Sequence, residues 1–183
     1  LFANAKPGDV KYLDISGPDG VPDGIVSATY DRVPLASNLP HYPVSLNLNV
    51  GYKNFDLSFF VQGVMKQTSI LYGALIEGPN WENYTHKAML GRWTQDNPNP
   101  RATWPRLERG STRSQESSDF WLRDTKYVRM KNVTLGYNLS GPVLSKIGLQ
   151  SARIYIGADN LFTITGEDLL DPEFPSGGRV TYY

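Results

Sequence analysis

The chain has 183 residues, 18 basic and 18 acidic side chains, no cysteine and only two histidines. Zero net charge without basic runs argues against a protein that binds nucleic acid. The lack of cysteine excludes disulfides and thiolate metal sites within the chain, and two histidines are too few for a zinc cluster of histidines. The many tyrosines, tryptophans, glycines and prolines (11, 4, 17 and 13) are typical of a turn-rich β protein.

Residues 1–43 are predicted to be a loop, because glycines and prolines interrupt every regular element. Aspartates are spread through its glycine-rich part, among them Asp14, Asp19, Asp23 and Asp31. Ca²⁺ loops collect carboxylate ligands in this way, so Asp14, Asp19 and Asp23 are candidate ligands of a Ca²⁺ ion, the one possible cofactor. Their spacing does not match an EF-hand. The alternative is a turn cluster in which aspartates accept hydrogen bonds from backbone N–H groups.

Residues 44–65 carry the clearest hairpin pattern of the chain. Apolar side chains alternate with serine, asparagine and glycine from Val44 to Tyr52, and a second alternating run starts at Phe55. Lys53-Asn54 stands between the two runs. A period of two with a short polar turn predicts a pair of antiparallel strands.

Residues 66–120 are predicted to be a long loop with a short helical piece near residues 81–90. Loops of this length are uncommon in compact domains unless they are functional, whereas outer-membrane barrels carry long loops on one side. The charged run at residues 106–124 is interpreted as a solvated loop that pairs its own charges.

The same long loop contains a candidate ligand-binding patch of Trp81, Asn83 and Tyr84. Sugar rings stack on aromatic faces, and a neighbouring amide can bind sugar hydroxyl groups. The alternative is that these aromatic side chains pack the loop or lie at a membrane interface. This structural role is the favoured interpretation for Trp93 and Trp104.

No arrangement of residues indicates catalysis, and we predict that the chain is not an enzyme. Glu77 and Glu82 could be imagined as a glycosidase pair, but nothing in the sequence fixes their separation. The sequence has no nucleophile elbow, phosphate-binding loop or zinc-protease motif.

Residues 121–139 and 149–162 are predicted to be two further strands joined by a connection that contains Gly-Pro. The alternation slips around Lys131-Asn132, which predicts a β-bulge. One face of these strands is apolar, and the other is mostly threonine, glycine, asparagine and tyrosine. An apolar face opposite an uncharged polar face suits a membrane barrel, with lipid outside and water inside.

Five blocks stand in order along the chain: PGDVKYLDISGPDG, LPHYPVSLNLNVGYKNFDLSFFVQG, GRWTQDNPNPRATWPRL, YVRMKNVTLGYNLS and ARIYIGADNLFTITG. A DPE triplet follows at 171–173. Together these blocks resemble the SusC/RagA-like family of TonB-dependent outer-membrane transporters, and they cover nearly the whole chain.

The resemblance implies an all-β fold, namely antiparallel strands of a transmembrane β-barrel with long extracellular loops; the family's barrel has about 22 strands. Residues 1–183 would be the C-terminal part of that barrel, without the plug domain and the last strand. The lumen would be lined by Asn47, Asn49, Asp56 and Gln62.

The resemblance also implies a function and a place in the cell. The parent protein would lie in the outer membrane of a Gram-negative bacterium and import oligosaccharides or peptides. Its partners would be a SusD-like surface lipoprotein and the TonB complex, which would act through the N-terminal region that this chain lacks. The alternative is a soluble carbohydrate-binding β-sandwich, which would close on itself in water. A glycoside hydrolase is a third hypothesis.

Overall fold

The computed structural model describes residues 5–35, 37, 39–71, 76, 85–108, 113–167, 169 and 171–173. The chain divides into two compact units, and each is described by itself. Unit 1 comprises Leu1–Ser37, Ser69–Arg123 and Pro175–Tyr183. Unit 2 comprises Asn38–Thr68 and Asp124–Phe174.

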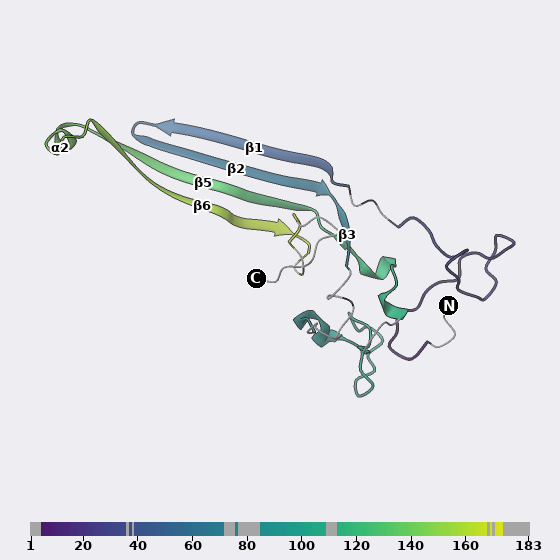
Figure 1. Cartoon of the computed structure of the whole chain (residues 1–183). Helices are drawn as coiled ribbons and strands as arrows, with labels where there is room; N and C mark the ends of the chain where they lie inside the picture. The colour runs from purple at the N-terminus through teal and green to yellow at the C-terminus, as the bar shows by residue number, and fades with distance from the viewer. Residues whose placement is uncertain are drawn as a thin grey trace. The chain divides into compact units, whose positions relative to one another are not determined.

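Unit 2 is built on a four-stranded antiparallel sheet with the strand order β1-β2-β5-β6 (Figure 1). The strands are β1 (His41–Tyr52), β2 (Phe55–Lys66), β5 (Tyr127–Ser140) and β6 (Ser151–Thr165). The predicted hairpin is confirmed, with β1 starting at His41 and the turn at Lys53-Asn54. The turn places Lys53 in the left-handed region, at a φ of 54°.

The two ends of this sheet differ in their connections. At one end lie the tight β1–β2 turn and the connection between β5 and β6, which contains the short helix α2 (Pro142–Ser145). At the other end His41 pairs with Lys66, so the segment before β1 and the segment after β2 both leave the sheet there. The described residues of unit 1 lie in these two segments.

The predicted bulge at Lys131 is confirmed. On β2, Phe60 pairs with Asn132 and the next residue, Val61, pairs with Met130, so Lys131 is the extra residue. The register between β5 and β6 shifts at the same place. The bulge resets the alternation, which lets one face of the sheet stay apolar along its whole length.

The sheet has one apolar and one polar face. The register brings Leu46, Val61 and Met130 together on the apolar face, and Leu57, Leu135 and Ile156 follow further along it. Val61 and Met130 are half-buried, whereas the others are exposed; on β6, Ile154 is 64% and Ile156 is 73% exposed. A β-sandwich would cover such a face with a second sheet.

Short elements make up the regular structure of unit 1. In the described part of this unit they include β3 (Thr68–Ile70), η1 (Lys87–Gly91), η2 (Arg113–Gln115), η3 (Asp119–Trp121) and β4 (Leu122–Asp124). β3 and β4 pair with each other, where the chain passes between the units. Of the helical piece predicted near residues 81–90, residues 81–84 lie outside the described residues, and the described remainder contains the 3-10 helix η1. In the described part of the chain, no helix is long and apolar enough to cross a membrane.

The single strand predicted over residues 121–139 is wrong in one respect, because the structure divides it into β4 and β5. Between them, the backbone N–H of Thr125 donates to the carbonyl of Gln67, at 3.0 Å. The backbone N–H of Lys126 donates to the side chain of Asp124, at 3.2 Å. One of these hydrogen bonds is to a distant residue and the other is local, and both stand where the strand is interrupted.

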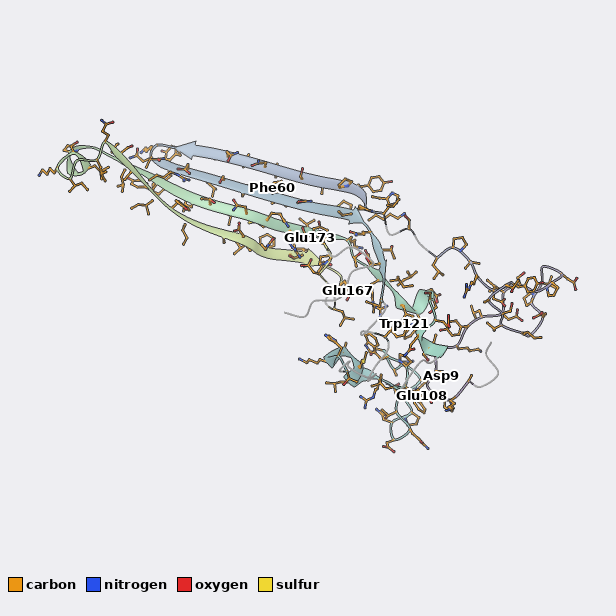
Figure 2. The ribbon with its side chains drawn as sticks, in the orientation of Figure 1. Asp9, Phe60, Glu108, Trp121, Glu167 and Glu173 are labelled. Atoms are coloured by element: carbon orange, nitrogen blue, oxygen red, sulfur yellow. The ribbon has the colours of Figure 1, made fainter. Side chains whose placement is uncertain are left out.

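The core of unit 1 is centred on Trp121, whose side chain is fully buried (Figure 2). Its ring packs 5.4 Å from Trp104 and 4.8 Å from Phe120, between ring centroids. Its Nε1 donates to the carbonyl of Ser114, at 2.8 Å, so the polar atom of the indole is also satisfied. The structural role predicted for Trp104 is thereby confirmed, since this side chain is buried.

Candidate functional site

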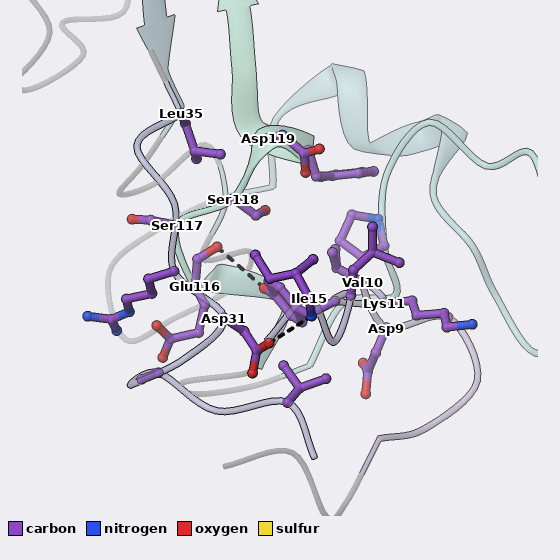
Figure 3. Close-up of a pocket in the computed structure, with 18 of the residues that line it drawn as sticks. Asp9, Val10, Lys11, Ile15, Asp31, Leu35, Glu116, Ser117, Ser118 and Asp119 are labelled. Atoms are coloured by element: carbon purple, nitrogen blue, oxygen red, sulfur yellow. Dashed lines mark hydrogen bonds between the residues drawn. The ribbon is translucent and has the colours of Figure 1, made fainter. Parts of the chain in front are cut away.

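Unit 1 contains an open hollow of about 1080 Å³, called here the unit 1 hollow. All its lining residues belong to unit 1, in the ranges 8–35, 93–105 and 116–120 (Figure 3). Aliphatic side chains from the first segment face carboxylates and serines from the segment that ends in η3. The hollow therefore combines apolar contact surface with hydrogen-bonding and charged groups, as ligand sites do.

Asp31 organises the first wall of the hollow. Its carboxylate accepts hydrogen bonds from the backbone N–H groups of Ser16 (3.0 Å), Ser27 (2.6 Å) and Ile15 (2.8 Å), the last of which is drawn in Figure 3. The hydrogen bond from Ser27, followed by that from Ile15, holds the pKa of Asp31 below its usual value. The carboxylate thus shapes the loop, and its oxygens are occupied by backbone donors.

An ionic cluster ties the first segment of unit 1 to residues 106–108. Arg106 Nε donates to Asp9 Oδ1 at 2.6 Å, and the same guanidinium pairs with Glu108. Hydrogen bonds from Arg106 and then Lys6 lower the pKa of the Glu108 carboxyl. The predicted self-pairing of the charged run is confirmed for Arg106 and Glu108.

The aspartates predicted to bind Ca²⁺ make turn contacts in this loop. The carboxylate of Asp14 accepts from the backbone N–H of Gly24, and that of Asp23 accepts from Ile25, at 2.8 Å. Among the described residues, no three histidine, aspartate or glutamate side chains are grouped to hold a metal ion. Ca²⁺ binding by Asp14, Asp19 and Asp23 stays a prediction.

The other predicted site residues lie elsewhere. Trp81, Asn83 and Tyr84, the proposed ligand-binding patch, are outside the described residues. Glu77 and Glu82 are outside them too. Trp93 is half-buried, and a Cβ on Gly8 would collide with its indole ring, so it packs against the backbone of the first segment.

The polar face of the unit 2 sheet carries the residues predicted to line a lumen. The register pairs Asn47 with Phe60, Asn49 with Ser58, and Gln62 with Arg129. Asp56 forms an ion pair with Arg153 and accepts a hydrogen bond from Asn138 Nδ2, at 3.0 Å. The four predicted residues therefore share one face, opposite the apolar one.

Sequence reasoning missed a second ionic cluster on this face. Arg129 Nη2 donates to Asp171 at 2.8 Å, and Arg129 Nη1 donates to Glu173 at 2.7 Å. Lys131 at the bulge donates to Glu173 at 2.8 Å. The signal for it was present, since Arg129 and Lys131 stand close together on β5 and a DPE triplet follows β6, but the contacts join residues about 40 positions apart.

No family model matches the chain. The chain is 31% identical over 173 residues to TonB-dependent receptor P3 of Formosa agariphila, a match that covers 94% of the chain and 16% of that receptor. It is 24% identical over 178 residues to TonB-dependent receptor SusC of Bacteroides thetaiotaomicron, covering 95% of the chain and 16% of SusC. The resemblance to SusC/RagA-like TonB-dependent receptors is confirmed.

Solved structures agree with this SusC/RagA-like assignment. The fold matches the RagAB peptide importer in its open-open state with a TM-score of 0.59 and 25% identity, over 87% of this chain and 17% of that one. It matches another structure of the RagAB peptide transporter with a TM-score of 0.60 and 24% identity, over 93% and 20%. The all-β antiparallel fold is confirmed, and the chain spans about a sixth of the curated relatives it matches.

Proposed function

We propose that unit 2 forms four neighbouring strands in the wall of an outer-membrane barrel, and that the parent protein imports its ligand in a TonB-dependent manner. One observation carries the proposal. One face of the sheet is apolar at nearly every position, with side chains such as Leu46, Leu135 and Ile156 exposed, while the opposite face carries mostly amides, hydroxyls and paired charges. Lipid on one side and a wet lumen on the other explain this pattern.

The outer strands of the sheet fit the same proposal. β1 and β6 each pair with one neighbour in the sheet, so each has a free row of backbone N–H and C=O groups. In a barrel, those groups pair with the next strands of the wall, which the remaining chain of the parent supplies. Closure of the barrel thus pairs the edges of β1 and β6 and also turns the apolar side chains toward lipid.

The lengths of the connections give an orientation. Bacterial barrels have short periplasmic turns and long extracellular loops. The Lys53-Asn54 turn and the α2 connection accordingly mark the periplasmic end, and the residues of unit 1 belong to extracellular loops. In this orientation the unit 1 hollow is on the side from which an imported ligand arrives.

The ligand and partner are proposed from the relatives. The RagAB neighbour is described as a peptide importer and SusC as a TonB-dependent receptor. We infer that the parent protein imports oligosaccharides or peptides, acts with a SusD-like surface lipoprotein and receives energy from the TonB complex. Its location is the outer membrane of a Gram-negative bacterium, and it breaks no covalent bond of its ligand.

Membrane fractionation of the full-length parent tests this function. We expect recovery in the outer-membrane fraction, with a compact gel band that shifts when the sample is boiled. Affinity purification from mild detergent should also recover a surface lipoprotein. Release of the parent as a detergent-independent soluble monomer would overturn the proposal and favour the carbohydrate-binding β-sandwich.

A further inference from the structure

We propose that the unit 1 hollow is a peptide-binding subsite, in which Glu116, Ser118 and Asp119 hold an ammonium group of the peptide. The inference rests on the proposed import function and selects peptides over oligosaccharides as the ligand class. The three residues belong to unit 1, and all three line the hollow.

The first observation is an unsatisfied hydroxyl. Ser118 lines the hollow and is 8% exposed, and its buried Oγ has no hydrogen-bond partner among the described residues. A buried polar atom without a partner destabilises a fold, so its presence here needs a reason. A ligand group that hydrogen bonds to this oxygen supplies the missing partner.

The second observation is the charge around that hydroxyl. Glu116 and Asp119 flank Ser118 in the chain, and both residues are exposed and line the hollow. The carboxylate of Asp31 is already occupied by backbone donors and that of Asp9 by Arg106, whereas in the described part of the chain no ion pair involves Glu116 or Asp119. Two free carboxylates beside a free hydroxyl favour an ammonium group, which donates three hydrogen bonds.

A cation on another wall gives the hollow groups of both charges. Lys11 also lines the hollow and lies on the opposite side from Glu116 in Figure 3. Among the described residues, no ion pair engages Lys11 either. A peptide presents ammonium and carboxylate groups that suit both sites, whereas a neutral oligosaccharide has neither.

The apolar surface of the hollow also favours a peptide. Branched aliphatic side chains line it, including Leu13 (70% exposed) and Val33 (55% exposed). Sugars bind preferentially to flat aromatic faces, but Trp104 is buried against Trp121 and Trp93 is packed against Gly8. The other aromatic side chains of the described lining, Tyr12 and Phe120, are half-buried, and Phe120 packs against Trp121. Aliphatic pockets instead accept apolar side chains of a peptide.

Calorimetric titration of the full-length parent in detergent tests the inference. The probes are an N-acetylated peptide of three Lys-Val-Gly repeats, its N-acetylated Glu-Val-Gly counterpart, which has no ammonium group, and a neutral glucose heptasaccharide. We expect the lysine peptide to bind at least about tenfold more tightly than either of the others, because hydrogen bonds between an ammonium group and carboxylates are stronger than those between neutral groups. Equal affinities, or preferential binding of the saccharide, would overturn the assignment.

Variants locate the binding to these residues. The double variant Glu116→Gln/Asp119→Asn should weaken the lysine peptide at least about tenfold. Ser118→Ala should weaken it about fivefold without lowering the Tm, because the lost hydroxyl has no partner in the fold. Asp124→Asn removes a carboxylate from unit 2 and should leave the affinity unchanged.

The two proposals fail in different ways. If the double variant or Ser118→Ala binds the lysine peptide as the unaltered parent does, the subsite is wrong even when the parent fractionates with the outer membrane. If the parent is a soluble monomer, the import function fails first, whatever the titration shows.

Discussion

Unit 2 and unit 1 differ in how they pack their largest apolar side chains. The sheet of unit 2 leaves large aliphatic groups such as Ile156 exposed on one face, whereas unit 1 buries Trp121 completely. Unit 2 is held by regular ladders between long strands, and unit 1 by an aromatic core, an arginine cluster and aspartates that bind backbone N–H groups. The exposed apolar face of unit 2 agrees with the proposed function, in which lipid covers that face.

The largest expected effect is the loss of the unit 1 core. Trp121→Ala should destabilise unit 1 by about 3–5 kcal/mol, because it leaves a cavity where Trp104 and Phe120 now pack. Protease added to intact cells should then cut within residues 5–37 or 85–123. The heat-modifiable band of the barrel should persist. If the band is lost together with the protease resistance of the loops, the two units are not independently stabilised.

A matched pair of arginine substitutions on β1 tests which face of the sheet contacts lipid. Leu48 lies on the apolar face, and the next residue, Asn49, lies on the polar face. Leu48→Arg should destabilise folding into lipid vesicles by about 2–4 kcal/mol if the position lies near the bilayer centre, whereas Asn49→Arg should change it far less. Urea titration of the refolded parent measures both values. Equal losses would contradict a lipid-facing assignment.

Acidification should loosen the loop of unit 1 that Asp31 organises. The pKa of Asp31 is lowered, so its stabilising contribution is complete above the unfolded value of about 4 and disappears as the pH falls through the folded value. Amide hydrogen exchange at Ile15, Ser16 and Ser27, corrected for intrinsic rates, should rise in that range. In Asp31→Asn these amides should exchange rapidly at every pH. A pH-dependent protection that survives the substitution would assign it to another group.

The smallest effect is expected at an exposed ion pair of unit 2. Asp124 and Lys126 form a salt bridge of 2.5 Å, with both side chains more than half exposed. Asp124→Asn should cost at most about 1 kcal/mol, because water and salt screen such pairs. Its Tm, compared with that of the unaltered parent, sets the background for the other variants. A large decrease would show that this pair has a structural role that its exposure does not suggest.

Local patterns in the sequence determined much of unit 2. The alternation in β1, β2 and β6 and the slip at Lys131 each depend on neighbouring residues, and all reappear in the structure. The break between β4 and β5 was not predicted, because it depends on a hydrogen bond from Thr125 to Gln67, a distant residue in the sequence. The agreement with SusC/RagA-like receptors followed from the blocks that contain these strands.

Unit 1 was the less predictable part, for a physical reason. Its hollow joins residues near the start of the chain to Glu116–Phe120, and no periodic pattern announces contacts across such a separation. The sequence alone determined a two-faced antiparallel sheet, because side-chain direction in a strand alternates residue by residue. Only the tertiary structure decided that Ser118 is buried without a partner and that Arg129 binds Asp171 and Glu173, since burial and pairing depend on where distant segments pack.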